Sequence, residues 1–140
     1  MRPAEMADLL NFISATDGRN LTPQMPHAWM EHIGELDYAD AKDAVRHHFR
    51  SSTEWLMPAH IANRVEAVRR RRIAAASPIE VNAADSGDVA HELETRKRLI
   101  NAIAAGRMTK HHYLTYKAGI EPLETFSGAH QLTTPRTHNQ

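Results

Sequence analysis

Hydrophobic residues recur three and four positions apart along most of the first half of the chain, a spacing that predicts amphipathic helices. The first predicted helix covers residues 3–14 and has a proline in its first turn. Turn-forming residues at 17–20 end the pattern. The second predicted helix has Thr22 as its N-cap, Pro23 at its first position and its end near Gly34.

The same spacing continues in two further segments. A third helix is predicted over residues 38–49 with Asp37 as its cap, and a fourth is predicted to start at Pro58 and to run into an arginine-rich end. The connections between the four helices are short, so we expect the helices to pack around one core. The sequence therefore predicts a compact four-helix domain over residues 1–76.

The second half of the chain has a different composition. Residues 77–90 are rich in Ala, Ser, Asn, Asp and Gly, which predicts a flexible linker. Helical spacing then returns, with Asp88 starting one helix and Thr109 capping a shorter one, so a helical hairpin is predicted over residues 91–119. Residues 120–140 are mostly polar and show no period, which predicts a disordered tail. No alternating strand pattern of useful length was found, so the predicted fold class is all-α.

Composition is typical of a small soluble protein. The chain has 140 residues, of which 41% are hydrophobic, enough for one modest core with a smaller appendage. It contains no cysteine, so disulfides and Cys-based zinc sites are excluded. No segment approaches the roughly 20 apolar residues that span a bilayer, and none resembles a signal peptide. We expect a cytoplasmic protein without a membrane partner.

Charge is balanced overall but unevenly distributed. The formal net charge is zero, while residues 1–57 carry nine acidic and five basic side chains, and residues 58–76 carry five basic side chains and one acidic. The predicted fourth helix ends in four consecutive arginines, which sample the whole helix circumference and cannot all be buried. We expect them to meet an anionic partner; the alternative is a solvated helix end. The candidate binding residues are Arg64, Arg69, Arg70, Arg71, Arg72, Arg96, Lys97, Arg98, Lys110 and Lys117.

The N-terminal pattern resembles a known family. The segments AEMADLL (residues 4–10) and HAWMEHIGEL (27–36) are followed by a helix from Asp37 to Phe49 and by a Ser-rich turn into MPAHI (57–61). This order is similar to the N-terminal domain of bacteriophage helicase loader/inhibitor proteins and replisome organizers, and it resembles small helical proteins of actinobacterial phages. The resemblance implies a non-enzymatic replication accessory protein that contacts the replicative helicase, or DNA, in the host cytoplasm.

Two other functions remain open. The segment from Arg96 to Gly119 could form a DNA-binding helix-turn-helix whose second helix presents Lys110, His111, Tyr113 and Lys117, or it could be a plain helical hairpin. Alternatively, the acidic N-terminal surface could bind a bacterial host protein without nucleic acid.

Other chemistry has weaker support. The ten histidines form no pair with the spacing of a zinc-protease helix, so we expect no metal and no cofactor. No phosphate loop or nucleophile elbow is present, and we do not expect an enzyme. The helical phase of the aromatic residues predicts core packing rather than a base-stacking platform. These residues are Trp29, Trp55, Phe49 and Tyr38.

Overall fold

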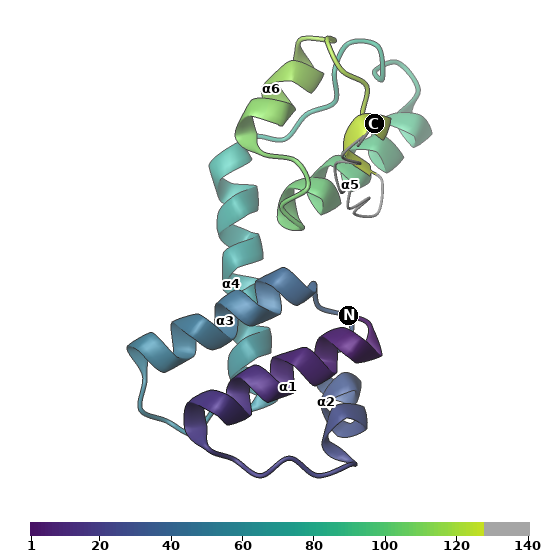
Figure 1. Ribbon diagram of the computed structural model, residues 1–140. Helices are drawn as coiled ribbons and strands as arrows, with labels where there is room; N and C mark the ends of the chain where they lie inside the picture. The colour runs from purple at the N-terminus through teal and green to yellow at the C-terminus, as the bar shows by residue number, and fades with distance from the viewer. Residues whose placement is uncertain (128–140) are drawn as a thin grey trace, which may run out of the picture. The chain divides into compact units, whose positions relative to one another are not determined.

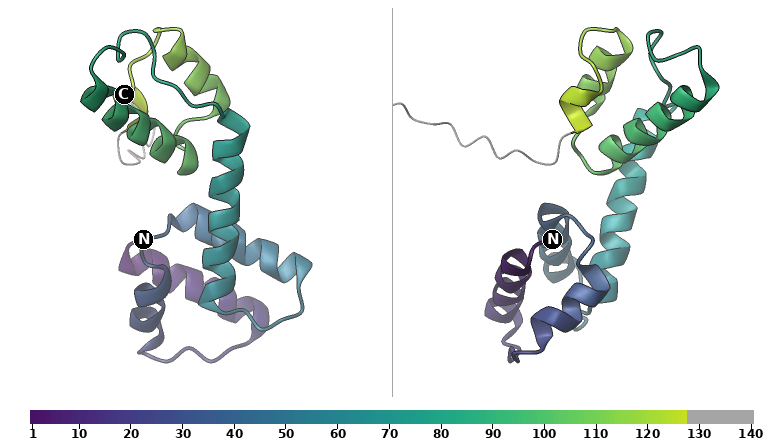
Figure 2. Two further views of the ribbon diagram at one scale, coloured as in Figure 1. Left: turned by 180° about the vertical axis from the view of Figure 1, so that it is seen from behind. Right: turned by 90° about the vertical axis from the view of Figure 1, so that its right-hand side faces the viewer.

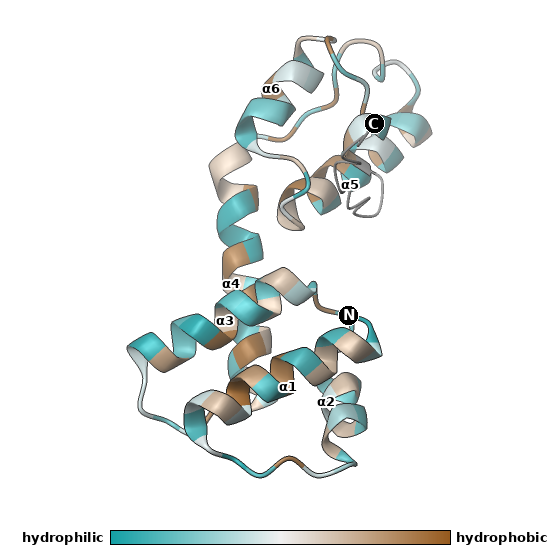
Figure 3. Ribbon diagram, in the orientation of Figure 1, coloured by the Kyte–Doolittle hydropathy of each residue, from teal (hydrophilic) through white to brown (hydrophobic). Residues whose placement is uncertain are grey.

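The computed structural model describes residues 1–127, and within that range it is all-α, with seven helices and no strand (Figure 1). The chain divides into two compact units, Met1–Arg70 and a second that begins at Arg71. The boundary lies inside helix α4 (Pro58–Ala76) and splits the arginine run. Figure 3 shows that run as a hydrophilic band in α4.

The first unit contains α1 (Pro3–Asp17), α2 (Met25–Ile33), α3 (Tyr38–Ser51) and the first part of α4. Helix α1 packs against both α2 and α3, and the three can be followed in Figures 1 and 2. The predicted helical spacing explains the packing, because hydrophobic residues three or four positions apart share one helix face. The buried core consists of Met6, Leu9, Leu10, Ile13, Trp29, Ile33, Ala41, Ala44, Val45, Leu56, Ile61 and Val65.

Capping residues set the helix boundaries of this unit. Asp37 caps α3 as predicted, since its carboxylate accepts a hydrogen bond from the Asp40 amide at 3.1 Å. The predicted start of the second helix is wrong by a few residues. Thr22 and Pro23 lie in a turn, in which the Met25 amide donates to the Thr22 carbonyl at 3.1 Å, and the proline in the first turn of α2 is Pro26.

The second unit contains α5 (Val89–Ala104), α6 (Lys110–Lys117), α7 (Glu124–Ser127) and the last turn of α4. Thr109 caps α6 as predicted, and Asp88, where the sequence predicts the start of a helix, is the cap of α5. Each accepts a hydrogen bond from an amide three residues on. The unit has its own buried core. It consists of Ala76, Ile79, Leu99, Ala102, Ile103, Met108, Tyr113, Tyr116, Leu123 and Phe126.

The segment between α4 and α5 differs from the flexible linker that its composition predicts. Ile79 is buried in the second core, and the Glu80 amide donates to the Tyr113 hydroxyl at 2.9 Å. Asn82 is also buried, and its amide and side-chain nitrogens donate to the hydroxyl and carbonyl of Tyr116, both at 3.1 Å. In Figure 1 this segment passes alongside α6 before α5 begins. The tyrosines satisfy its backbone groups, so it is part of the second unit.

The predicted tail also begins too early. Residues 120–127 include the short helix α7, and Leu123 and Phe126 are buried against the second core. The rest of the predicted tail, residues 128–140, lies outside the described residues. Across residues 1–127, no helix combines the length and the hydropathy that crossing a bilayer requires.

Candidate functional site

The ten predicted binding residues divide between the two units. Arg64, Arg69 and Arg70 belong to the first unit and to α4. Arg70 is exposed, and its Nη2 lies 3.7 Å from the Glu66 carboxylate one turn earlier. An exposed pair of this kind contributes little to stability, so Arg70 remains accessible to a partner. Arg64 and Arg69 are half-buried and form no ion pair within residues 1–127.

Arg72 has a structural role that the sequence did not reveal. Its Nη1 donates to the carbonyl of Ala104, the last residue of α5, at 3.0 Å. A cation at the C-terminal end of a helix satisfies an open carbonyl and the helix dipole together. The guanidinium also lies close to Gly106. A Cβ atom added at Gly106 would lie 3.2 Å from the Cζ of Arg72. Arg72 therefore joins the end of α5 to the last turn of α4.

Two further candidates also hold the second unit together. The Arg98 guanidinium lies 3.7 Å from the Glu124 carboxylate of α7. Lys117 donates to the carbonyl of Val81 at 2.9 Å, and its ammonium lies 3.6 Å from the Glu80 carboxylate. Both cations therefore pair with segments that the sequence had assigned to a tail and a linker.

The remaining candidates of the second unit are open to solvent. Arg71, Arg96, Lys97 and Lys110 are exposed and form neither an ion pair nor a hydrogen bond between side chains within residues 1–127. We call these four residues the unpaired cations. They lie on α4, on α5 and at the first position of α6. Among residues 1–127 no carboxylate is paired with them, so they can bind an external anion.

Helices α5 and α6 and the connection between them form the predicted helix, glycine-containing turn and helix. Gly106 has a φ of +74°, a left-handed conformation that ends α5 and favours glycine. On α6, Lys110, His111 and Leu114 are exposed, whereas Tyr113 and Tyr116 are buried. The prediction that Tyr113 lines the outer face is wrong, because its hydroxyl is used to hold the Glu80 amide.

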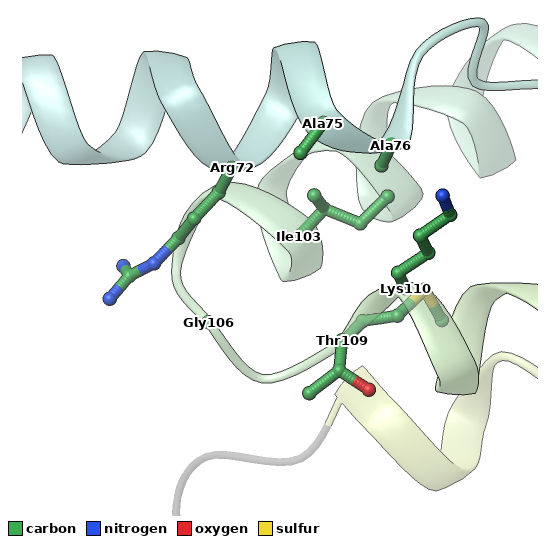
Figure 4. Close-up of a pocket in the computed structure, with 8 residues that line it drawn as sticks. Arg72, Ala75, Ala76, Ile103, Gly106, Thr109 and Lys110 are labelled. Carbon is green, nitrogen blue, oxygen red and sulfur yellow. The ribbon is translucent and has the colours of Figure 1, made fainter.

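A pocket of about 280 Å³ opens in the second unit (Figure 4). Its lining comes from the last turn of α4, the end of α5 and the start of α6. Figure 4 shows Arg72 and Lys110 on opposite sides of Ile103. The sequence did not predict this pocket, which depends on two stretches, residues 72–76 and 103–110, that are far apart in the chain. Its lining residues are Arg72, Ala75, Ala76, Ile103, Gly106, Met108, Thr109 and Lys110.

The aromatic residues of the first unit are only partly where the helical phase predicts. Trp29 is in the core, and Phe49 and Tyr38 are half-buried against it. Trp55 is different, since it is 55% exposed and its ring covers the Arg19 guanidinium, with the Arg19 Cζ 4.2 Å from the ring centroid. The core prediction for Trp55 is therefore wrong, because Arg19, itself buried, occupies the space beneath the ring.

Two titrating groups of the second unit, Tyr116 and Asp85, have shifted pKa values. Burial, together with a 2.7 Å hydrogen bond to the Asp85 carboxylate, raises the pKa of Tyr116 to about 12. The same hydrogen bond, with further help from His91, lowers the pKa of Asp85. Both groups hold the segment before α5 and lie outside the lining of the pocket.

Several histidines have local partners. The His48 side chain is buried, with its Nε2 2.7 Å from the Glu54 carbonyl, and His27 forms an exposed pair with Glu31 at 3.7 Å. His60 and His112 each accept a hydrogen bond from the amide three residues earlier, at the start of α4 and α6. Over residues 1–127 there is no group of three or more side chains that could hold a metal ion.

Comparison with protein-family models, curated proteins and solved structures found no match to this chain.

Proposed function

We propose that this protein is a non-enzymatic accessory factor of bacteriophage DNA replication that binds an anionic partner through its second unit. The partner is DNA or an acidic surface of the replicative helicase. The observation that carries the proposal is the set of unpaired cations, Arg71, Arg96, Lys97 and Lys110, which are exposed and have no carboxylate partner within residues 1–127. The link to replication rests on the resemblance of residues 1–76 to helicase loaders.

Electrostatics favour a local contact. The net charge of the whole chain is zero, so long-range attraction to a polyanion is weak, and binding depends on cations brought close to the partner. Exposed lysines and arginines release counterions when they neutralise phosphates, and this gives binding a steep dependence on salt. The same cations would also pair with carboxylates on a protein surface.

DNA binding can be tested by fluorescence anisotropy, with labelled single and double strands of about 20 nucleotides and salt raised from about 50 to 200 mM. The test variant replaces Arg96 and Lys97 of α5 with Gln. The control variant replaces Arg46 and Arg50 of α3 with Gln, which removes the same charge from the first unit. We expect the test variant to reduce the log–log salt slope by about 2 and the control to leave it unchanged.

Helicase binding needs a parallel experiment. The wild-type chain and both variants are used to capture the purified replicative helicase of the host. Capture that is lost in the Arg96/Lys97 variant and kept in the control supports a helicase partner. If neither DNA nor helicase binding depends on these residues, the proposal is overturned, and the acidic surface of the first unit becomes the better candidate for binding a host protein.

A second candidate function is a sequence-specific DNA-binding regulator. It is favoured by the exposed face of α6, where Lys110, His111 and Leu114 are available to base edges and phosphates. Selection from a random duplex library separates the two candidates. Enrichment of one short sequence, abolished by Lys110→Ala, supports a regulator. Binding without enrichment supports the accessory factor.

A further inference from the structure

We infer that the pocket of the second unit is a docking site for a peptide of a protein partner, one that inserts an aromatic side chain flanked by carboxylates. The inference rests on the proposed function, since it assumes an anionic partner. It deepens that function by stating which chemistry the partner presents.

The walls of the pocket suit an aromatic group. Apolar surface is provided by Ala75, Ala76, Ile103 and Met108. The side chains of the two alanines are small, so they leave space on the α4 side of the pocket. Cavities of about 150 Å³ lined by such residues bind benzene. A volume of about 280 Å³ leaves room for a larger ring together with the backbone atoms next to it. Ile103 and Met108 are almost completely buried, so the floor is part of the second core.

The rim of the pocket is positive. Lys110 lines this rim. Its side chain is exposed and forms no hydrogen bond or ion pair within residues 1–127. Arg72 lines the opposite side, where its Nη1 is bonded to the Ala104 carbonyl at 3.0 Å. Within the described part of the chain, residues 1–127, no carboxylate lines the pocket. A ligand that combines an apolar ring with neighbouring negative charge is therefore complementary to it.

A peptide fits better than a nucleobase. A base that enters a pocket needs polar partners for its edge as well as a surface to stack on. The Thr109 hydroxyl already caps α6 by accepting the His112 amide at 3.2 Å. The Arg72 and Lys110 side chains offer only donors, and Ala75, Ala76, Ile103 and Met108 offer no strong acceptor, so the amino groups of a base would find no side-chain acceptor. An aromatic side chain such as that of phenylalanine needs no hydrogen-bond partner in the pocket. Buried hydrophobic anchors of this kind contribute most of the binding energy in many protein interfaces.

The test is a titration of the full-length protein, followed by amide chemical shifts in NMR. The first peptide is acetyl-Asp-Trp-Asp-amide. In the second peptide, acetyl-Asn-Trp-Asn-amide, asparagine replaces both charged aspartates. In the third, acetyl-Asp-Ala-Asp-amide, alanine replaces the tryptophan. A short single-stranded DNA serves as the competing class of ligand. Two variants probe the site, Ala75→Leu to fill the pocket and Lys110→Gln to remove the rim charge. The control is Ala74→Leu, because Ala74 is an exposed neighbour on α4 that does not line the pocket.

We expect the first peptide to shift resonances of residues 103–110 and to bind about tenfold more tightly than either altered peptide. Ala75→Leu should abolish these shifts, Lys110→Gln should weaken binding about fivefold, and Ala74→Leu should change neither. Equal binding by Ala75→Leu and the parent protein would overturn the inference, as would shifts produced by DNA alone. Because Arg96 and Lys97 do not line the pocket, the Arg96/Lys97 variant tests the proposed function separately.

Discussion

The guanidinium of Arg19 lies against the face of Trp55, with its Cζ 4.2 Å from the ring centroid. Arg19 is only 8% exposed, although it carries a full charge. Its Nη2 donates to the Asp17 carboxylate at 2.6 Å and to the Leu56 carbonyl at 2.9 Å, so the charge is both paired and hydrogen-bonded. These bonds connect the end of α1 to the segment before α4. An exposed tryptophan thereby shields a buried cation from water.

Replacing Arg19 with Ala should destabilise the first unit by about 3–5 kcal/mol. The substitution removes the guanidinium from the Asp17 carboxylate, which keeps only the backbone amide of residue 19, and leaves the Leu56 carbonyl without its partner; broken buried pairs carry costs of this size. The pKa of Asp17 should also rise. Burial already acts to raise it, and the hydrogen bonds from Arg19 are what hold it below its usual range.

Urea unfolding followed by circular dichroism measures the effect of Arg19→Ala. Arg2→Ala is the matched control, because the side chain of Arg2 is largely exposed and its pair with Glu5 should contribute at most about 1 kcal/mol. Equal costs for the two substitutions would contradict a buried, structural role for Arg19.

The two tryptophans should respond differently to truncation. Trp29 is 7% exposed and belongs to the first core, so Trp29→Ala should cost about 3–5 kcal/mol. Trp55 is half-exposed, so Trp55→Ala should cost only about 1 kcal/mol, mainly through the lost contact with Arg19. Melting temperatures of the two variants provide the comparison. An unchanged melting temperature for Trp29→Ala would refute its assignment to the core.

The Tyr116 hydroxyl should be essential to the second unit. It accepts the Asn82 amide and donates to the Asp85 carboxylate at 2.7 Å. Tyr116→Phe removes both bonds and leaves buried polar groups without partners, at a cost of about 1–3 kcal/mol. Hydrogen exchange should locate the loss, with faster exchange of the Asn82 amide and no change in the first core. Exchange that is equally slow in the variant would contradict this role.

Stability should fall at both extremes of pH. The pKa of Tyr116 is raised to about 12, above the value of about 10 in an unfolded chain, so its contribution is complete below pH 10 and is lost as pH rises through 12. The pKa of Asp85 is lowered, so its contribution is present above about pH 4 and is lost as pH falls through its folded value. Thermal unfolding across this range should show the alkaline loss in the parent protein and a reduced loss in Tyr116→Phe.

A fragment that ends at Ala76 should fold on its own. Every residue of the first core lies between Met6 and Val65, so removal of the later chain takes no member away from that core. The fragment should show a single cooperative thermal transition and dispersed amide resonances. A molten or insoluble fragment would show that the second unit is needed to complete the first.

Local signals in the sequence were enough to predict most of the helices. Asp37, Asp88 and Thr109 act as caps within three residues of the amides that they bind, and Pro58 starts α4. Such signals are read from neighbouring residues, so they do not depend on the tertiary structure. The run of arginines predicts that some of them are exposed, as Arg70 and Arg71 are, but it does not predict that Arg69 and Arg72 are half-buried.

Features that depend on distant residues could not be predicted from local patterns. The segment before α5 resembles a linker in composition, and its order comes from Tyr113 and Tyr116, more than thirty positions away. Trp55 has the phase of a core residue, and only the position of Arg19 explains its exposure. The pocket is formed by residues 72–76 together with residues 103–110, and neither stretch alone indicates it.

Each hydrophobic core is drawn from one uninterrupted stretch of chain, residues 6–65 for the first and 76–126 for the second. A crossover between related genes near the codon for Arg70 would therefore transfer all the residues of one hydrophobic core and leave the other core intact. Substitutions in one half of the chain could then accumulate without removing any member of the other half's core.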